Sequence, residues 1–100
     1  MNFPQWVNRA PGGGRARREV VASNRLRYLL HKLALEHNSL GSVKQLAGSV
    51  GMHHSTFSIY IRRGHFSPAA ALALEKNFGP DVCKASWLRE PLTIETTTLQ

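Results

Sequence analysis

Apolar residues recur at helical spacing in several stretches of the chain, and short polar or glycine-containing segments separate these stretches. The longest stretch runs from about Glu19 to His37 and contains no Gly or Pro. Its apolar residues fall at i, i+3, i+4 and i+7, the spacing of one face of a helix. These residues are Leu26, Leu29, Leu30 and Leu33. The pattern predicts a first helix whose leucines pack into a core.

A shorter stretch with the same spacing begins after Ser42, which is a good N-cap residue. Its apolar residues are Val43, Leu46, Ala47 and Val50. Gly51 then favours a tight turn with a left-handed backbone. A further helix is predicted at about residues 53–63. Its candidate buried residues are Phe57, Tyr60 and Ile61. Two short helices that cross at a small residue, here Ala47, and are joined by a glycine turn are typical of a helix-turn-helix.

The remaining pattern predicts one more full helix and a short closing segment. Ser67 as N-cap, Pro68 at the first helical position and Gly79 beyond the last turn favour a helix between them. Residues 81–89 follow Pro80 and predict a segment that closes the core. Its apolar residues are Val82, Trp87 and Leu88.

Both ends of the chain are predicted to lie outside the domain, which is expected at residues 19–91. Residues 1–18 hold three consecutive glycines and four arginines, so we expect a flexible basic arm. Such an arm either tracks DNA or is an inert leader. Residues 92–100 are β-prone and either pair across a dimer or form a C-terminal tail, and the tail is favoured.

Basic charge is concentrated in the first two thirds of the 100-residue chain. Residues 1–63 hold ten Lys or Arg and two Glu, a net charge of +8, whereas residues 64–100 hold three Lys or Arg and four Asp or Glu, a net charge of −1. The basic part includes the helix-turn-helix, which favours a polyanionic partner over a neutral one. A merely solvated basic surface is the alternative.

Several function classes find no support in the sequence. The single cysteine, Cys83, cannot form an internal disulfide, which favours a reducing compartment. No signal peptide is predicted, and no apolar run approaches the ~20 residues of a membrane span. The histidines show no zinc spacing, and no phosphate-binding glycine loop is present. We therefore expect a non-enzymatic cytoplasmic protein without cofactor, metal, membrane or small-molecule substrate.

The run from Val43 to Glu75 resembles small phage-type Cro/repressor domains, most closely the YdaS-like, Cro-like prophage regulators and antitoxins. The matching elements are Leu46-Ala47…Gly51, the turn after Arg63-Gly64, and Ser67-Pro68…Leu72-Ala73-Leu74-Glu75-Lys76…Gly79. The resemblance implies an all-α, five-helix, lambda-repressor-like domain that binds DNA, often as a dimer, in a bacterial or phage-infected cell near the nucleoid. The chain departs from the family pattern at His53-His54, where a Ser or Thr cap is usual, and Ser55 is an alternative cap.

The third predicted helix would read DNA in the major groove. Its candidate base-contacting residues are His53, His54, Ser55, Ser58, Ile59 and Arg62. Arg62 can fork to a guanine edge or hold a phosphate, and Ile59 either touches a thymine methyl or belongs to the core. The candidate phosphate contacts are Ser42, Lys44, Thr56, Arg63, Arg15, Arg17 and Arg18.

These patterns together predict a sequence-specific, double-stranded DNA-binding transcription regulator. The alternative is a helix-turn-helix protein that serves as an adaptor, either an antitoxin or a phage accessory subunit. A homodimer is expected, because one reading helix covers few base pairs. Its interface would be either the C-terminal tail or the apolar surface around Trp87 and Leu88, and the second is favoured.

Overall fold

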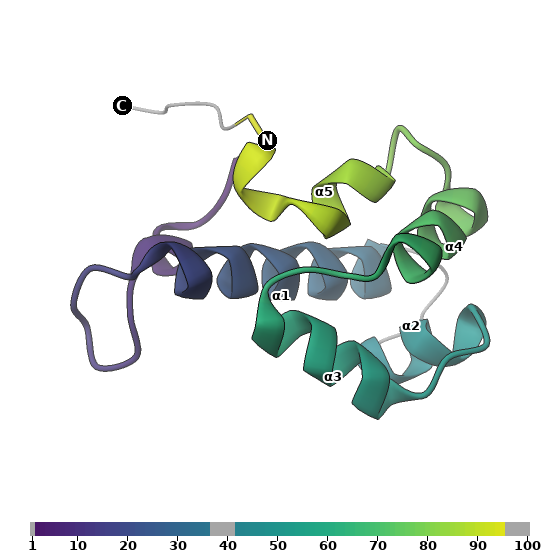
Figure 1. Ribbon diagram of the computed structural model, residues 1–100, viewed down its shortest axis with the longest axis horizontal. Helices are drawn as coiled ribbons and strands as arrows, with labels where there is room; N and C mark the ends of the chain where they lie inside the picture. The colour runs from purple at the N-terminus through teal and green to yellow at the C-terminus, as the bar shows by residue number, and fades with distance from the viewer. Residues whose placement is uncertain (1, 37–41, 96–100) are drawn as a thin grey trace.

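The computed structural model describes residues 2–36 and 42–95. Within these residues the chain forms five α-helices and two short 3-10 turns, η1 (Gln5–Asn8) and η2 (Pro91–Thr93). The helices are α1 (Arg18–Glu36), α2 (Val43–Ser49), α3 (His54–Arg63), α4 (Pro68–Phe78) and α5 (Ala85–Arg89). Figure 1 shows α1 through the middle of the molecule, with α5 above it and α2 and α3 below it. The prediction of an all-α, five-helix domain is confirmed.

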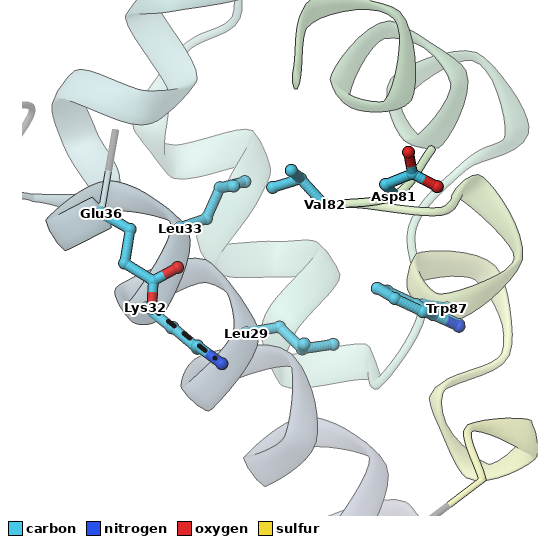
Figure 2. A pocket seen from close by; sticks show the side chains of 7 residues that line it. All are labelled: Leu29, Lys32, Leu33, Glu36, Asp81, Val82 and Trp87. Carbon is cyan, nitrogen blue, oxygen red and sulfur yellow. Dashed lines mark ion pairs between the residues drawn. The ribbon is translucent and has the colours of Figure 1, made fainter. Parts of the chain in front are cut away.

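The core lies where α1 meets the other four helices. Leu26, Leu30 and Leu33 of α1 are 0–5% exposed and pack with residues of α2 to α5. Phe57 of α3 meets Phe66 edge to face, with 5.1 Å between the ring centroids. The prediction that Leu29 packs into the core is wrong, because Leu29 is only partly buried and lines a surface hollow (Figure 2). The remaining fully buried side chains of this core include Leu46, Ala47, Leu74 and Leu88.

Helix boundaries follow the capping residues of the sequence. The Ser42 hydroxyl accepts a hydrogen bond from the Gln45 amide at 3.2 Å, and the Ser67 hydroxyl accepts one from the Ala70 amide at 3.3 Å. Each bond satisfies an amide that the first turn of a helix leaves without an intrahelical partner. Gly79 ends α4 with φ of +94°, a conformation that side chains disfavour.

The N-terminal segment, which the sequence predicts to be a flexible arm outside the domain, packs in part against α1 within the described residues 2–18. Val7 is fully buried, and the side-chain amide of Asn24 on α1 donates to the carbonyls of Val7 and Arg9 at 3.0 and 3.2 Å. The glycines make a turn, in which the Ala10 amide donates to the Gly14 carbonyl at 2.7 Å. Low side-chain content suggests an unpacked arm, whereas the burial of Val7 and these backbone bonds oppose the entropic cost of ordering the segment.

The C-terminal segment also packs against α1 as far as it is described. The Arg25 guanidinium donates to the carbonyls of Pro91 and Ile94 at 2.9 and 3.4 Å, and Ile94 is only 6% exposed. Burial lowers the pKa of Arg25, although the guanidinium remains charged at neutral pH. The predicted tail is therefore wrong for residues 92–95, and residues 96–100 lie outside the described chain. Leu88 is 1% exposed, so it cannot belong to the predicted apolar dimer surface around Trp87 and Leu88.

No helix in the described ranges is both long enough and apolar enough to cross a membrane.

Replacing Asn24 by Ala should destabilise the fold by about 1–3 kcal/mol, because a buried carbonyl of Val7 would lose its donor. Urea-induced unfolding measures the change. Asn77→Ala is the matched control, since Asn77 is exposed on α4 and surface substitutions shift stability by about 0.5 kcal/mol or less. Equal stability of the two variants would show that the Asn24 bonds to the N-terminal segment add nothing to the stability of the fold.

Candidate nucleic-acid interface

The α2–α3 pair has the geometry of a helix-turn-helix. Ala47 of α2 and Phe57 of α3 are both fully buried where the two helices pack. The turn between the helices is closed by backbone bonds, with the Met52 amide donating to the Ala47 carbonyl at 2.9 Å. Gly51 has φ of +73°, which confirms the left-handed glycine that the turn requires. Because Ala47 is fully buried, we expect a larger side chain there to be overpacked.

His53 caps α3, which corrects the expectation of a helix that includes His53 or is capped by Ser55. The backbone of His53 is extended, and its ring atom Nδ1 accepts a hydrogen bond from the Ser55 amide at 3.2 Å. The same Nδ1 lies 2.7 Å from the Ser55 hydroxyl. Imidazole thus takes the part of the usual Ser or Asp cap. The His54 ring lies beside it, with 4.5 Å between the ring centroids.

Gly64 ends α3 in a left-handed conformation with φ of +84°. A Cβ at this position would lie 3.1 Å from the Cβ of Ala22 on α1 and 3.5 Å from the Glu19 carbonyl oxygen. The end of α3 therefore sits directly on the first turns of α1. Two separate constraints favour glycine at this position: the left-handed backbone and the short distance to Ala22.

The outward side of α3 is polar and basic, as the sequence predicts. Its exposed side chains are His53, His54, Ser55, Ser58, Ile59, Arg62 and Arg63. Ile59 is 43% exposed, which excludes a core position. Thr56 is only partly buried, while Phe57 and Ile61 face the core.

The polar groups of this surface differ in how far they are already bonded. Ser58 donates its hydroxyl to the His54 carbonyl at 3.1 Å, so only its lone pairs are free to accept. Arg63 and His65 lie close, with 3.0 Å from Nη2 to Nε2. The Arg62 side chain makes no hydrogen bond or ion pair to any residue of the described chain. Its guanidinium is therefore available to a ligand.

The candidate phosphate contacts fall into two groups. Ser42 and Lys44 lie at the start of α2, but the Ser42 hydroxyl already caps that helix. Arg18 begins α1 and lines one hollow of about 570 Å³ together with Arg63 and Arg89. Arg89 was not predicted, because nothing in its local sequence places the end of α5 beside α3. Arg15 and Arg17 are exposed in the N-terminal segment and do not line this hollow.

The arginines near α3 form no ion pair with a carboxylate of the described chain. In the described ranges one ion pair is present, between Lys32 and Glu36 at 4.0 Å on the C-terminal half of α1. Glu19 and Glu90 line the same hollow as the arginines but form no ion pair with them in that part of the chain. The hollow thus holds three arginines and two glutamates, which leaves a small net positive charge beside the C-terminal end of α3.

Cys83 is buried, and burial and the Glu75 carboxylate raise the pKa of its thiol to about 12. The thiolate, which is the nucleophile and the metal ligand, is therefore scarce at neutral pH. Among residues 2–36 and 42–95, no three His, Cys, Asp or Glu residues lie together as metal ligands would.

Neither family models, nor curated proteins, nor solved structures give a match to this chain.

Two glycine substitutions should have opposite effects on stability. Gly48 lies inside α2 with open space at its Cβ position, so Gly48→Ala should stabilise the fold by about 0.5–1 kcal/mol. Gly64→Ala should destabilise it by at least about 1 kcal/mol, because φ is positive and Ala22 is close. Urea unfolding of both variants tests the pair, and the reverse order would contradict the described packing of α3 on α1.

Loss of the His53 cap should weaken α3. His53→Ala should cost about 1 kcal/mol, whereas His53→Ser should keep most of the stability because a serine hydroxyl can accept from the same amide. Thermal unfolding measures both. Equal melting temperatures of the serine and alanine variants would show that the cap does not stabilise α3.

Proposed function

We propose that the protein binds double-stranded DNA through α3, which enters the major groove and reads base edges, and that it acts as a transcription regulator. The observation that carries the proposal is the exposed, unpaired guanidinium of Arg62 on the outward side of a helix-turn-helix. A reading helix in this motif presents its outward side chains to the groove. The resemblance to Cro-like regulators implies the same activity.

Each outward side chain has a definite chemistry to offer a base pair. Arg62 can donate two parallel hydrogen bonds to the O6 and N7 atoms of guanine. Ser58 can accept from an exocyclic amine with the lone pairs that its internal bond leaves free. Ile59 can contact a thymine methyl group, since it is exposed. A short site with at least one G·C pair and one A·T pair follows.

Phosphate contacts would hold the helix in its register. Arg63, Arg18 and Arg89 come from three different helices to one hollow beside the C-terminal end of α3. Unpaired cations in this position can follow the DNA backbone where it leaves the major groove. Such contacts add affinity but no sequence information.

The adaptor alternative is favoured less, because it needs an apolar patch on the outward side of α3. Ile59 is the one large apolar side chain of α3 that is exposed. Its neighbours on that side are hydroxyl, imidazole and guanidinium groups, which a protein partner would have to desolvate.

Duplex binding should weaken steeply as salt rises. If about four phosphates are neutralised, affinity falls about a hundredfold between about 50 and 200 mM monovalent salt. Fluorescence anisotropy with a labelled duplex from a random-pool selection measures the slope. Affinity independent of salt, or no binding at low salt, would refute the proposal.

Arg62→Ala should lower affinity for the selected duplex by about 1–3 kcal/mol and relax the preference at one base pair. Lys84→Ala is the control, because Lys84 is exposed before the start of α5 and does not line the hollow that holds Arg63 and Arg89. Figure 1 shows α5 and α3 on their two sides of α1. A uniform loss over all sequences would instead assign Arg62 to a phosphate, and equal affinity of both variants would remove α3 from the interface.

A further inference from the structure

The segment of residues 8–16 folds back on itself as a short hairpin. The Ala16 amide donates to the Asn8 carbonyl at 3.1 Å, and Arg9 and Arg15 pair as an isolated antiparallel bridge. The hairpin leads directly into α1, which begins two residues later. Figure 1 shows it below the N-terminal end of α1, on the same side of that helix as α3. The hairpin is therefore a preformed element with a set direction.

The tip of this hairpin is almost without side chains. Pro11 is followed by Gly12, Gly13 and Gly14, and all four residues are exposed. Gly12 and Gly13 have φ of +93° and +98°, and a Cβ at any of the three glycines would meet nothing within 4 Å. Glycine allows a backbone to approach a ligand closely. The tip is thus narrow enough to enter a groove that would exclude bulkier residues.

Free guanidinium groups follow the glycine tip, and carboxylates are absent from this part of the sequence. Residues 2–18 hold four arginines and no Asp or Glu. The Arg9 side chain donates to Gln5 at 3.3 Å, whereas the exposed side chains of Arg15 and Arg17 make no hydrogen bond or ion pair within the described chain. Arginine on a narrow support suits the minor groove of DNA, where a narrow groove concentrates the negative potential.

The place of the hairpin on DNA follows from the arginines at the end of α3. Arg18 lines one hollow with Arg63, and both are proposed above to hold phosphates beside the major groove. Arg15 precedes Arg18 by three residues, which span at most about 11 Å when fully extended. Beyond the phosphates at the edge of the major groove lies the minor groove, about 6 Å wide. The hairpin can therefore reach the minor groove while α3 occupies the adjacent major groove.

We propose that the hairpin enters this minor groove and that Arg15 contacts the edges of A·T base pairs there. The inference rests on the proposed function of α3 and adds a second requirement to the DNA site. A·T pairs present only acceptors in the minor groove, whereas a G·C pair adds the N2 amine of guanine, a donor that the donor-only guanidinium cannot pair with. The site should therefore carry an A·T-rich flank. A phosphate contact, which is the sequence-based expectation for Arg15, would give no preference among bases.

Duplexes that differ only in their flanks test the proposal. Inosine is guanine without the N2 amine, so an I·C pair keeps the major-groove groups of G·C and lacks its minor-groove donor. Three duplexes share the bases selected for α3 and carry A·T, G·C or I·C pairs in both flanks. By fluorescence anisotropy, the wild type should bind the G·C-flanked duplex about tenfold more weakly than the A·T-flanked one. It should regain most of this loss on the I·C-flanked duplex.

Arg15→Ala should bind the three duplexes with similar affinity, and Lys84→Ala, the charge-matched control, should discriminate as the wild type does. Equal affinity of the wild type for the three duplexes, or unchanged discrimination by Arg15→Ala, overturns the proposal. The α3 site is the same in every duplex, so loss of the flank effect alone leaves the proposed function intact. Absence of binding to all three duplexes refutes the proposed function and this inference with it.

Two glycine substitutions test whether the shape of the hairpin matters. Gly13→Ala places a side chain at a φ of +98°, so it should loosen the turn and lower the flank discrimination about threefold or more. Gly14→Ala is the matched control, because its Cβ has open space and its φ lies outside the left-handed region. Circular dichroism should show the same helix content for both, since the hairpin contains no helix. Equal flank discrimination by the two variants overturns the role of the preformed hairpin.

Discussion

The close contact of Gly64 with Ala22 determines where α3 lies against α1. A side chain at Gly64 would bring its Cβ to 3.1 Å from Ala22, and the backbone there is left-handed. The chain can turn sharply at this point, so Phe66 reaches back to meet Phe57 in the core. The same contact brings the arginines at the end of α3 and the start of α1 into one hollow. The contact between Gly64 and Ala22 therefore sets both the packing of α3 on α1 and the position of these arginines.

Local geometry at both ends, rather than intrinsic helix propensity, stabilises α3. Ten residues are too few for a stable isolated helix in water. The His53 ring satisfies the first turn, Gly64 ends the last turn, and Phe57 and Ile61 bury the inner side. Among the outward residues, His53 and Ser55 form the cap and Ser58 makes one internal bond, whereas His54, Ile59 and Arg62 make no side-chain hydrogen bond within the described chain. Such a division lets the outward side change its chemistry without loss of the fold.

The helices and their serine caps could be predicted from sequence because their signals are local. Periodicity and N-cap residues act within one or two turns, and Ser42 and Ser67 behave as expected. The contacts of the two ends could not be predicted, since Asn24 bonds to a carbonyl 17 residues earlier and Arg25 to one 66 residues later. No spacing rule marks such bonds. The exposed candidates on α3 were found by helical phase, whereas Arg89 joins them only through the tertiary fold.

Arg25 also has a consequence for how this domain combines with other chains. The guanidinium lies over the Phe3 ring at 5.0 Å from its centroid and donates to the Pro91 and Ile94 carbonyls. The Arg25 side chain thus contacts both the N-terminal segment, at Phe3, and the C-terminal segment, at Pro91 and Ile94. A unit whose two ends meet can be inserted into a loop of another protein, or repeated in tandem on short linkers, without stretching either partner. The position of the two terminal segments depends on Arg25 of α1 and not on the exposed residues of α3.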